Sequence, residues 1–435
     1  MTVQVIKTKA EQALAARIGS LLASSALSPA EKRVREAASS EFQTRGLPSR
    51  RIEEWKFSDL RNLLKEAGND QGSTPREALE IAQRLGFEGV DADTYILIDG
   101  RMVGRPEGQG EPGVRVERLA DSVRHDPAVL GLSDVSTLDD GQKSVLALNT
   151  AMVTDGAVVT IAPGTPTTRP IHIVHVGLGA VAVRNIINVG AGSRATVVET
   201  HVGGGEGQRF ENAVTTVNLA DGATLEHLFL IETDQGSAYL GNIIAALGAS
   251  AVYRPFQLTS GAGLLRQQGT ITFDGQHGSF DFSAASVTAG EGHQDTTLVV
   301  DHKVPHCTSR ELYKTVLDGT ARGVFQGKVI VRPDAQKTDG KQMAQALMLS
   351  GEAEFDSKPE LEIYADDVIC GHGSTSAEID PDLIFYCRSR GIPEAQARAL
   401  LIESFIGEAV ERIDHDGLRV GVMARAMGLL RRSDT

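Results

Sequence analysis

The chain has 435 residues, of which 41% are hydrophobic and 23% are charged, and its formal net charge is −14 with a pI of about 5.3. This length predicts two or three domains with buried cores. The acidic balance and the absence of any Lys/Arg run argue against a nucleic-acid-binding face, and they favour protein or small-molecule partners.

The sequence also argues against membrane insertion and secretion. No apolar stretch reaches the roughly 20 residues that span a bilayer, and the N-terminal sequence lacks the apolar core of a secretory signal. We therefore expect a cytoplasmic protein. The three cysteines, Cys307, Cys370 and Cys387, form no disulfide framework and no Cys-x-x-Cys pair. Thiolates of this chain alone are not expected to hold a permanent metal cluster.

The first ~145 residues predict mostly helix. Ser28 and Pro29 are a favourable N-cap and first helical residue, and Thr74 to Glu77 form a capping box with proline at its first helical position. The alternating segment 94–100 predicts one short strand, and segment 105–113 predicts a loop.

From Asn149 to Ile369 the pattern changes to short runs of β-branched and apolar residues, with no helical segments between them. This disfavours a doubly wound α/β fold. Glycine turns recur at positions 192, 222, 248 and 275, so the intervals are 30, 26 and 27 residues. This spacing is typical of a solenoid and predicts a parallel β-helix. A β-sandwich also has short strands, but it is usually smaller than this block.

The end of the chain returns to helical patterns. Asp380 and Pro381 begin one helix, Pro393 begins an amphipathic helix that runs to Ile413, and a last helix covers about 418–432. We therefore predict a mainly β protein in three parts: a mostly helical domain (1–148), a parallel β-helix core (149–370) and a C-terminal helical domain (371–435).

No nucleotide-binding motif is present. Segment 323–329, GVFQGKV, has three residues between its glycines where a phosphate loop has four, and Val329 stands where Ser or Thr must reach magnesium. The glycine-rich segment 203–207 does not match a dinucleotide fingerprint and predicts a loop.

Two clusters contain residues that bind metals, 302–309 and 370–373. Residues two apart on a strand point to the same face, so Cys370 and His372 can converge on one ligand. Thiolate and imidazole suit iron or zinc, and Gly371 and Gly373 would let a partner's backbone come close. Two ligands do not complete a metal site, and a single cysteine is more often a small buried apolar residue. Both interpretations stay open at this point.

Several longer segments carry a family resemblance. They are RIEEWKFSDL (51–60), HCTSRELYKTVLDGTARGVFQGKVIV (306–331), QKTDG (336–340), SKPELEIYADDVICGHGSTSAEID (357–380) and FYCRSRGI (385–392). They resemble the SufB/SufD family of SUF iron–sulfur cluster assembly proteins, and within it the SufD branch. The resemblance implies a right-handed parallel β-helix flanked by helical domains. It also implies a scaffold without catalysis of its own.

The resemblance further implies partners and site residues. A SufB-like subunit would pair with this chain, and a SufC-like ATPase, which binds the ATP, would dock on its C-terminal region. His372 matches an interface histidine that helps to hold a transient Fe–S cluster, and Cys370 has a less certain role. His306 and Cys307 receive no ligand role. We expect the helix that starts at Pro393 to carry much of the ATPase docking surface, with these residues: Leu400, Glu403, Phe405 and Ile406.

Some questions stay open from the sequence. These are whether the chain alone forms a homodimer and whether a flavin binds in the complex, for which no fingerprint is present. One alternative is a SufB-like paralogue. Another is a carbohydrate-active β-helix enzyme, which needs clustered carboxylates. The tempting pair, Asp366 and Asp367, is adjacent in sequence and would face opposite sides of a strand.

Overall fold

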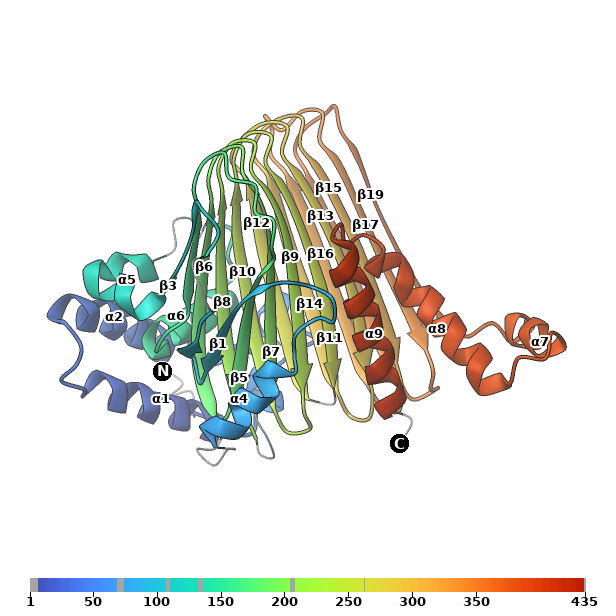
Figure 1. Ribbon diagram of the computed structural model, residues 1–435, viewed down its shortest axis with the longest axis horizontal. Helices are drawn as coiled ribbons and strands as arrows, with labels where there is room; N and C mark the ends of the chain where they lie inside the picture. Colours follow the sequence, from blue (N-terminus) through green and yellow to red (C-terminus); the bar gives the residue numbers. More distant parts are fainter. Residues whose placement is uncertain are drawn as a thin grey trace.

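The computed structural model describes residues 7–68, 74–106, 110–131, 136–203, 208–261 and 263–433. A long stack of strands forms the middle of the molecule, with helices near both chain ends (Figure 1). The N-terminal helices are α1 (Lys9–Leu22), α2 (Pro29–Arg45), η1 (Glu53–Trp55), α3 (Leu60–Leu63), α4 (Pro75–Gln83), α5 (Leu119–His125), η2 (Pro127–Leu130) and α6 (Asp140–Met152).

The predicted helix starts are confirmed. The side chain of Ser28 accepts a hydrogen bond from the backbone of Glu31 at the start of α2. Thr74 and Glu77 form the reciprocal capping box of α4. These bonds satisfy backbone N–H groups that have no partner inside the helix.

The strands form two sheets, and successive strands from β4 onward alternate between them. The first sheet contains β1 (Asp93–Ile98), β2 (Arg101–Gly104), β5 (Ile171–Gly177), β7 (Arg194–Gly203), β9 (Thr224–Thr233), β11 (Val252–Gly261), β13 (Ser279–Thr288), β15 (Thr308–Leu317), β17 (Asp339–Met348) and β19 (Ile369–Glu378). The second contains β3 (Val114–Arg118), β4 (Ala157–Ile161), β6 (Ala180–Val189), β8 (Phe210–Leu219), β10 (Ala238–Leu247), β12 (Leu264–Phe273), β14 (His293–His302), β16 (Arg322–Val331) and β18 (Glu354–Ile363).

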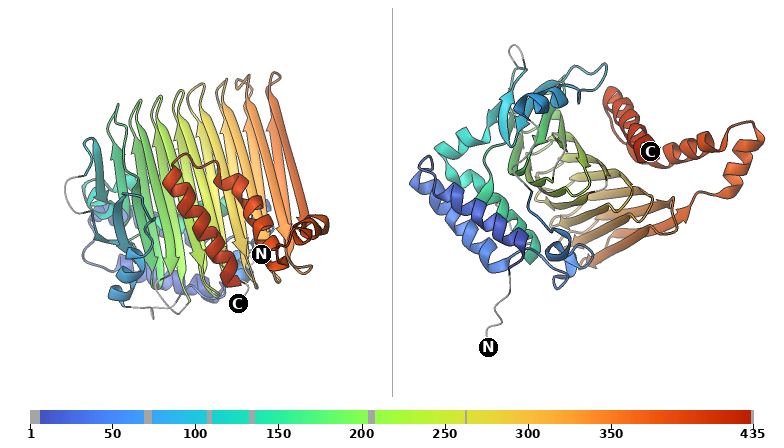
Figure 2. Two further views of the ribbon diagram at one scale, coloured as in Figure 1. Left: turned by 45° about the vertical axis from the view of Figure 1, so that its right-hand side comes forward. Right: turned by 90° about the horizontal axis from the view of Figure 1, so that it is seen from below.

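From β4 to β19 neighbouring strands of each sheet pair in parallel, so each pair of successive strands makes one turn of a β-solenoid (Figure 2). One face of each strand points inward, and these side chains fill the interior between the two sheets. The prediction of a mainly β protein with a parallel β-helix core and helices at both ends is confirmed.

The predicted length of the repeat is confirmed, but the residue at the turn and the role of the predicted glycines change along the chain. The first-sheet strands from β7 to β19 start every 27 to 31 residues. Two residues before β7 and β9 stand Gly192 and Gly222, with positive φ angles of 66° and 68°. At the equivalent position of the next four turns the chain has other residues, also with positive φ: Ser250, His277, His306 and Lys337. Gly248 and Gly275 instead allow close backbone approach, since a Cβ on Gly275 would lie 2.0 Å from the nitrogen of Ala249.

The short strand predicted at 94–100 is confirmed as β1, and the N-terminal region also contains β2 and β3, which were not predicted. β1 pairs in parallel with β5, and β3 pairs antiparallel with β4, so both extend the two sheets of the solenoid. The predicted loops at 105–113 and 203–207 lie partly outside the described residues. The domain boundaries at 148/149 and 370/371 remain predictions.

Segment 51–60 fastens the N-terminal helices to the outside of the second sheet. The guanidinium of Arg266 on β12 lies 3.8 Å from the centre of the Trp55 ring, and Trp55 Nε1 donates a hydrogen bond to Asp139 at 2.9 Å. Ser58 Oγ contacts Nε2 of His293 at 2.8 Å. Trp55, Arg266 and His293 are all buried, so segment 51–60 has a structural role.

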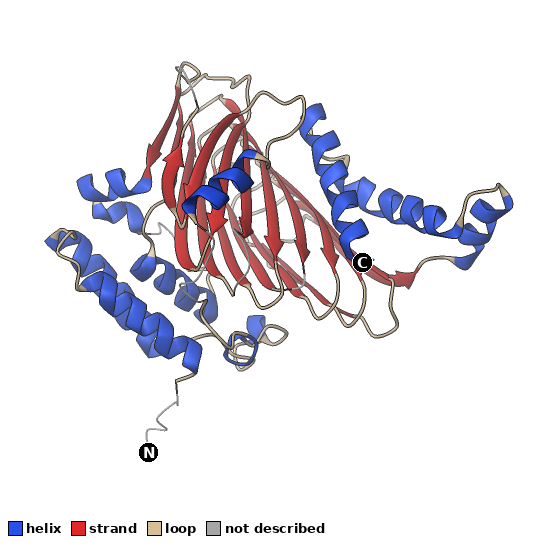
Figure 3. Cartoon of the chain, turned by 60° about the horizontal axis from the view of Figure 1, so that its bottom comes forward, coloured by secondary structure: helices blue, strands red, loops and turns tan. Residues whose placement is uncertain are grey.

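The C-terminal helices are α7 (Pro381–Ser389), α8 (Glu394–Val410) and α9 (Asp416–Ser433). The second half of α8 and the whole of α9 pack on the outer face of the first sheet, against β11, β13 and β15. The first half of α8 and α7 extend away from the solenoid (Figure 3). In the part of the chain that the structure describes, no helix is long and apolar enough to cross a membrane.

Candidate functional site

The last turn of the solenoid is open. Among the described residues β18 pairs only with β16, and β19 pairs only with β17. All residues of β14, in the middle of the stack, are buried, whereas those of β19 are exposed or half-buried. Large apolar side chains are exposed here, and they are Ile363, Tyr364 and Ile369. An unpaired strand edge with exposed apolar residues is typical of a surface that binds another protein chain.

Cys370 and His372 lie together on the inward-facing side of this last strand. In the β17–β19 ladder Cys370 is the partner of Gly340, and His372 is the partner of Gln342. Cys370 packs against the interior core, and strand alternation places His372 on the same face. The structure therefore brings the two predicted residues to the open end of the solenoid.

The two side chains differ in environment. Cys370 is half-buried, and burial raises the pKa of its thiol, which favours the protonated form. His372 is exposed, and its ring makes no hydrogen bond or ion pair with any described residue. An exposed imidazole without a partner can bind a ligand that a second chain presents.

The flanking glycines differ as well. A Cβ on Gly371 would have no atom within 4 Å, so a partner's backbone has room at this position. A Cβ on Gly373 would lie 2.8 Å from the Cε of Met343, whose side chain covers that glycine. The close approach expected from the sequence is therefore available at Gly371.

The cluster 302–309 has structural contacts. Cys307 is fully buried in the interior core, and burial raises the pKa of its thiol. His302 Nε2 contacts Ser309 Oγ at 3.1 Å, and its ring stacks on Phe273. His306 occupies a turn and stacks on His277 of the previous turn, with ring centres 4.9 Å apart. These residues line turns and core rather than the open end.

Sequence reasoning missed Glu311, which lies behind the open end. Glu311 on β15 is the register partner of Gln342, which is in turn the partner of His372. It is buried without a hydrogen-bond partner among the described residues, and burial raises its pKa to about 8. The alternation of Ser309, Glu311 and Tyr313 on one strand face was the available signal.

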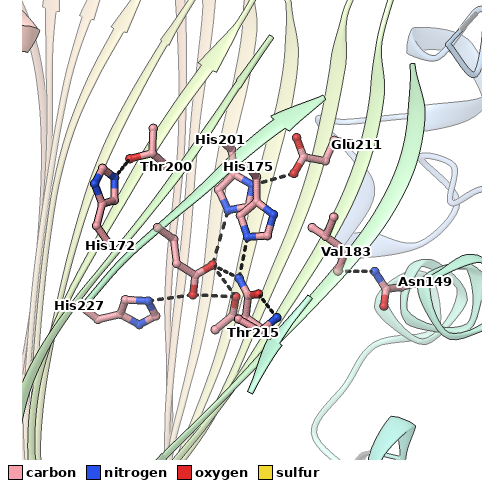
Figure 4. A network of polar contacts seen from close by, with 12 residues as sticks. Asn149, His172, His175, Val183, Thr200, His201, Glu211, Thr215 and His227 are labelled. Carbon is pink, nitrogen blue, oxygen red and sulfur yellow. Dashed lines mark hydrogen bonds and ion pairs between the residues drawn. The ribbon is translucent and has the colours of Figure 1, made fainter. Parts of the chain in front are cut away.

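Sequence reasoning also missed a buried network of histidines and glutamates at the other end of the interior (Figure 4). Glu199 contacts His227 Nε2 at 3.0 Å and accepts a bond from Asn185 at 2.8 Å. Burial disfavours the charge on His201, but Glu211 and Glu199 outweigh it and raise its pKa to about 9. Burial lowers the pKa of His175 to about 4. His175 and His201 are 26 residues apart in sequence, and only the pairing of β5 with β7 brings them together.

Comparison with known proteins assigns the class of protein that this solenoid represents. Residues 173–405 match the family model described as "SUF system FeS cluster assembly, SufBD core domain", and residues 20–173 match "SufBD protein N-terminal region". The core match alone covers more than half of the chain. The chain belongs to the SufBD family of iron–sulfur cluster assembly proteins.

Individual relatives agree with this assignment. The chain is 29% identical over 398 residues to the iron–sulfur cluster assembly protein SufD of Escherichia coli, covering 87% of this chain and 88% of that protein. It is 28% identical over 386 residues to a SufBD family protein of Synechocystis, covering 84% of each chain. A SufD of Bacillus subtilis matches at 27% over 225 residues, 48% of this chain and 51% of that protein.

The resemblance to the SufD branch is thus confirmed. The carbohydrate-active enzyme alternative receives no support. Segment 323–329 lies within β16, so its glycines belong to a strand and not to a loop that precedes a helix.

Proposed function

We propose that this chain is a non-catalytic scaffold subunit in iron–sulfur cluster assembly. It pairs through the open solenoid end with a SufB-like subunit and carries a SufC-like ATPase on its C-terminal helices. Family membership and the SufD relatives support the cluster-assembly role. We place this activity in the cytoplasm, where cysteines stay reduced.

One observation carries the proposal: His372 and Cys370 lie on the inward face of an unpaired end strand. Two ligands cannot complete a cluster site. Ligands from a partner that pairs along β18 or β19 would complete it, and a site shared between two chains can release its product. No permanent cluster is assigned to this chain, and we assign no flavin site. Without a partner, the same edge is available to a second copy of the chain.

The ATPase surface that we propose combines α7 with the first half of α8. Phe385 is 73% exposed, and Leu383, Tyr386 and Leu400 are also exposed. Pro393 stands at the start of α8 and is exposed, and Glu403 is half-buried. Exposed aromatic and aliphatic side chains on a helix that extends from the body suit a groove of another protein.

The remaining two docking candidates hold α8 in place. Ile406 is fully buried against the first sheet, and the Nζ of Lys314 lies 4.5 Å from the centre of the Phe405 ring. Their contribution to docking is to fix the direction of α8. ATP binding belongs to the partner in this proposal.

The test is co-purification of the full chain with SufB-like and SufC-like proteins. Ile369→Asp should abolish retention of the SufB-like subunit and keep the ATPase, whereas Phe385→Asp should do the opposite. Val420→Asp, at an exposed position of α9, is the matched control and should retain both. If both partners remain bound to the first two variants, or if the wild type retains neither, the proposed assembly is wrong.

A further inference from the structure

Three ligand-type side chains converge at the N-terminal end of the solenoid interior, far along the stack from β19. His175 on β5 and His201 on β7 are register partners, and their rings stack with centres 4.5 Å apart. Glu211, near the start of β8, comes from the opposite sheet, and its Oε1 lies 2.6 Å from Nδ1 of His201. One ligand atom from each residue lies within 4.8 Å of the other two.

The ring nitrogens of the two histidines are not all satisfied by hydrogen bonds within the described residues. Nε2 of His175 contacts the Asn185 amide at 3.0 Å, but its Nδ1 is buried and has no hydrogen-bond partner in the described part of the chain. Nε2 of His201 lies 3.5 Å from a carboxylate oxygen of Glu199. A buried ring nitrogen without a partner is unfavourable, and a ligand at this position would satisfy it.

The surroundings resemble those of a metal site. The register partners on either side of the two histidines are apolar, Leu97 and Ile231, and the ring of Tyr239 meets His201 edge-on at 5.2 Å. Behind the cluster, Glu199 contacts His201 and three further polar side chains, those of Asn185, Thr215 and His227. Carboxylates of this kind orient histidine ligands and increase their basicity.

We propose that His175, His201 and Glu211 bind one divalent transition-metal ion of the zinc or ferrous type. Two imidazoles and one carboxylate are a ligand set that both ions accept. The two rings are parallel within 5°, so they cannot both direct in-plane lone pairs at one ion. His175, whose ring stacks on His201 and has Asn185 as its one hydrogen-bond partner in the described part of the chain, turns about its Cβ–Cγ bond when the ion binds. This site lies in other turns of the solenoid than Cys370 and His372, and it does not depend on the proposed scaffold function.

Arg209 lies at the strand end next to the cluster. A Cβ on Gly203 would lie 2.3 Å from the guanidinium carbon of Arg209, so this side chain lies directly over the strand end. Arg209 is held there by Asp234, which is 65% exposed at its side chain. Arg209 therefore covers this strand end on the side of Glu211.

The experiment uses the full chain in a Cys370→Ser, His372→Ala background, so that ions at the open end do not contribute. After treatment with a chelator, the protein is titrated with Co²⁺ and then with Zn²⁺, following visible absorption. We expect one Co²⁺ per chain, displaced by Zn²⁺. Glu211→Gln and His175→Gln should each weaken binding at least about tenfold. His172→Gln is the matched control, because His172 is equally buried on the same strand but outside the cluster.

X-ray absorption of the wild-type chain loaded with one equivalent of Zn²⁺ keeps the proposal testable if a variant does not fold. It should show nitrogen and oxygen ligands at about 2.0–2.2 Å and no sulfur at about 2.3 Å. The proposal is overturned if the background chain binds no ion, if a folded Glu211→Gln binds as tightly as its parent, or if sulfur dominates the zinc shell of the wild type.

Discussion

Glu311 and Gln342 are register partners on β15 and β17, and within the described residues neither side chain has a hydrogen-bond partner. Both face the solenoid interior. There the side-chain oxygen Oε1 of Gln342 lies 2.7 Å from the position that a Cβ on Gly327 would take. Burial raises the pKa of Glu311 to about 8, so the protonated, neutral form of the carboxyl group predominates at pH 7.

This buried acid predicts that stability falls as pH rises. The folded-state pKa lies above the unfolded value of 4.5, so between these two values the unfolded chain binds fewer protons than the folded chain. The free energy of unfolding should decrease by about 1.4 kcal/mol per pH unit across this range. Glu311→Gln should remove that contribution. Its gain in the free energy of unfolding relative to wild type should therefore be larger at pH 7.5 than at pH 5. Urea unfolding at several pH values measures it, and equal slopes in both proteins would contradict the assignment.

Buried histidines predict the opposite trend on the acid side. Burial lowers the pKa of His172 to about 3 and of His302 to about 4, below the ordinary value of 6.5. As pH falls below 6.5 the unfolded chain takes up protons that the folded chain cannot, so stability is lost down to about pH 4 for His302 and about pH 3 for His172. His172→Gln should flatten the acid slope by about 1.4 kcal/mol per pH unit. An unchanged slope between pH 6 and pH 4 would show that His172 is protonated in the folded state.

The attachment of the N-terminal helices predicts a large effect at Trp55. Removing its ring leaves a cavity beside Arg266 and breaks the bond to Asp139. Trp55→Ala should cost about 3–5 kcal/mol in the free energy of unfolding. Trp55→Phe keeps a ring under the guanidinium and should cost less. A loss below about 1 kcal/mol for Trp55→Ala, measured by urea unfolding, would be inconsistent with this role.

The sequence predicts the fold well because the solenoid repeats a local signal. The turns before β7 to β17 each have one residue with positive φ two residues before the first-sheet strand, and Gly192 and Gly222 reveal it directly. The signal then weakens because Ser250, His277 and later residues take the same backbone conformation. β1 was predicted from the alternation of segment 94–100. β3 was harder to predict because it is stabilised by a partner strand distant in sequence.

The candidate site residues likewise include some that the sequence predicts and some that it does not. Cys370 and His372 could be found because strand alternation over three residues relates them. The cluster of His175, His201 and Glu211 could not, since it depends on the register of β5 with β7 and on a third strand from the opposite sheet. Glu311 carries no signal of burial in its residue type, because glutamate is usually exposed.

The most direct test of the scaffold account is the rate of cluster formation in a reconstituted complex of this chain with its SufB-like and SufC-like partners. His372→Ala should leave the complex intact by gel filtration and the ATPase rate unchanged, and it should reduce cluster formation at least about tenfold. Ser374→Ala, the next exposed residue on the same strand face, should behave as wild type, and Cys370→Ser should have a smaller effect than His372→Ala. Cluster formation at the wild-type rate in an intact His372→Ala complex would contradict the ligand role of His372.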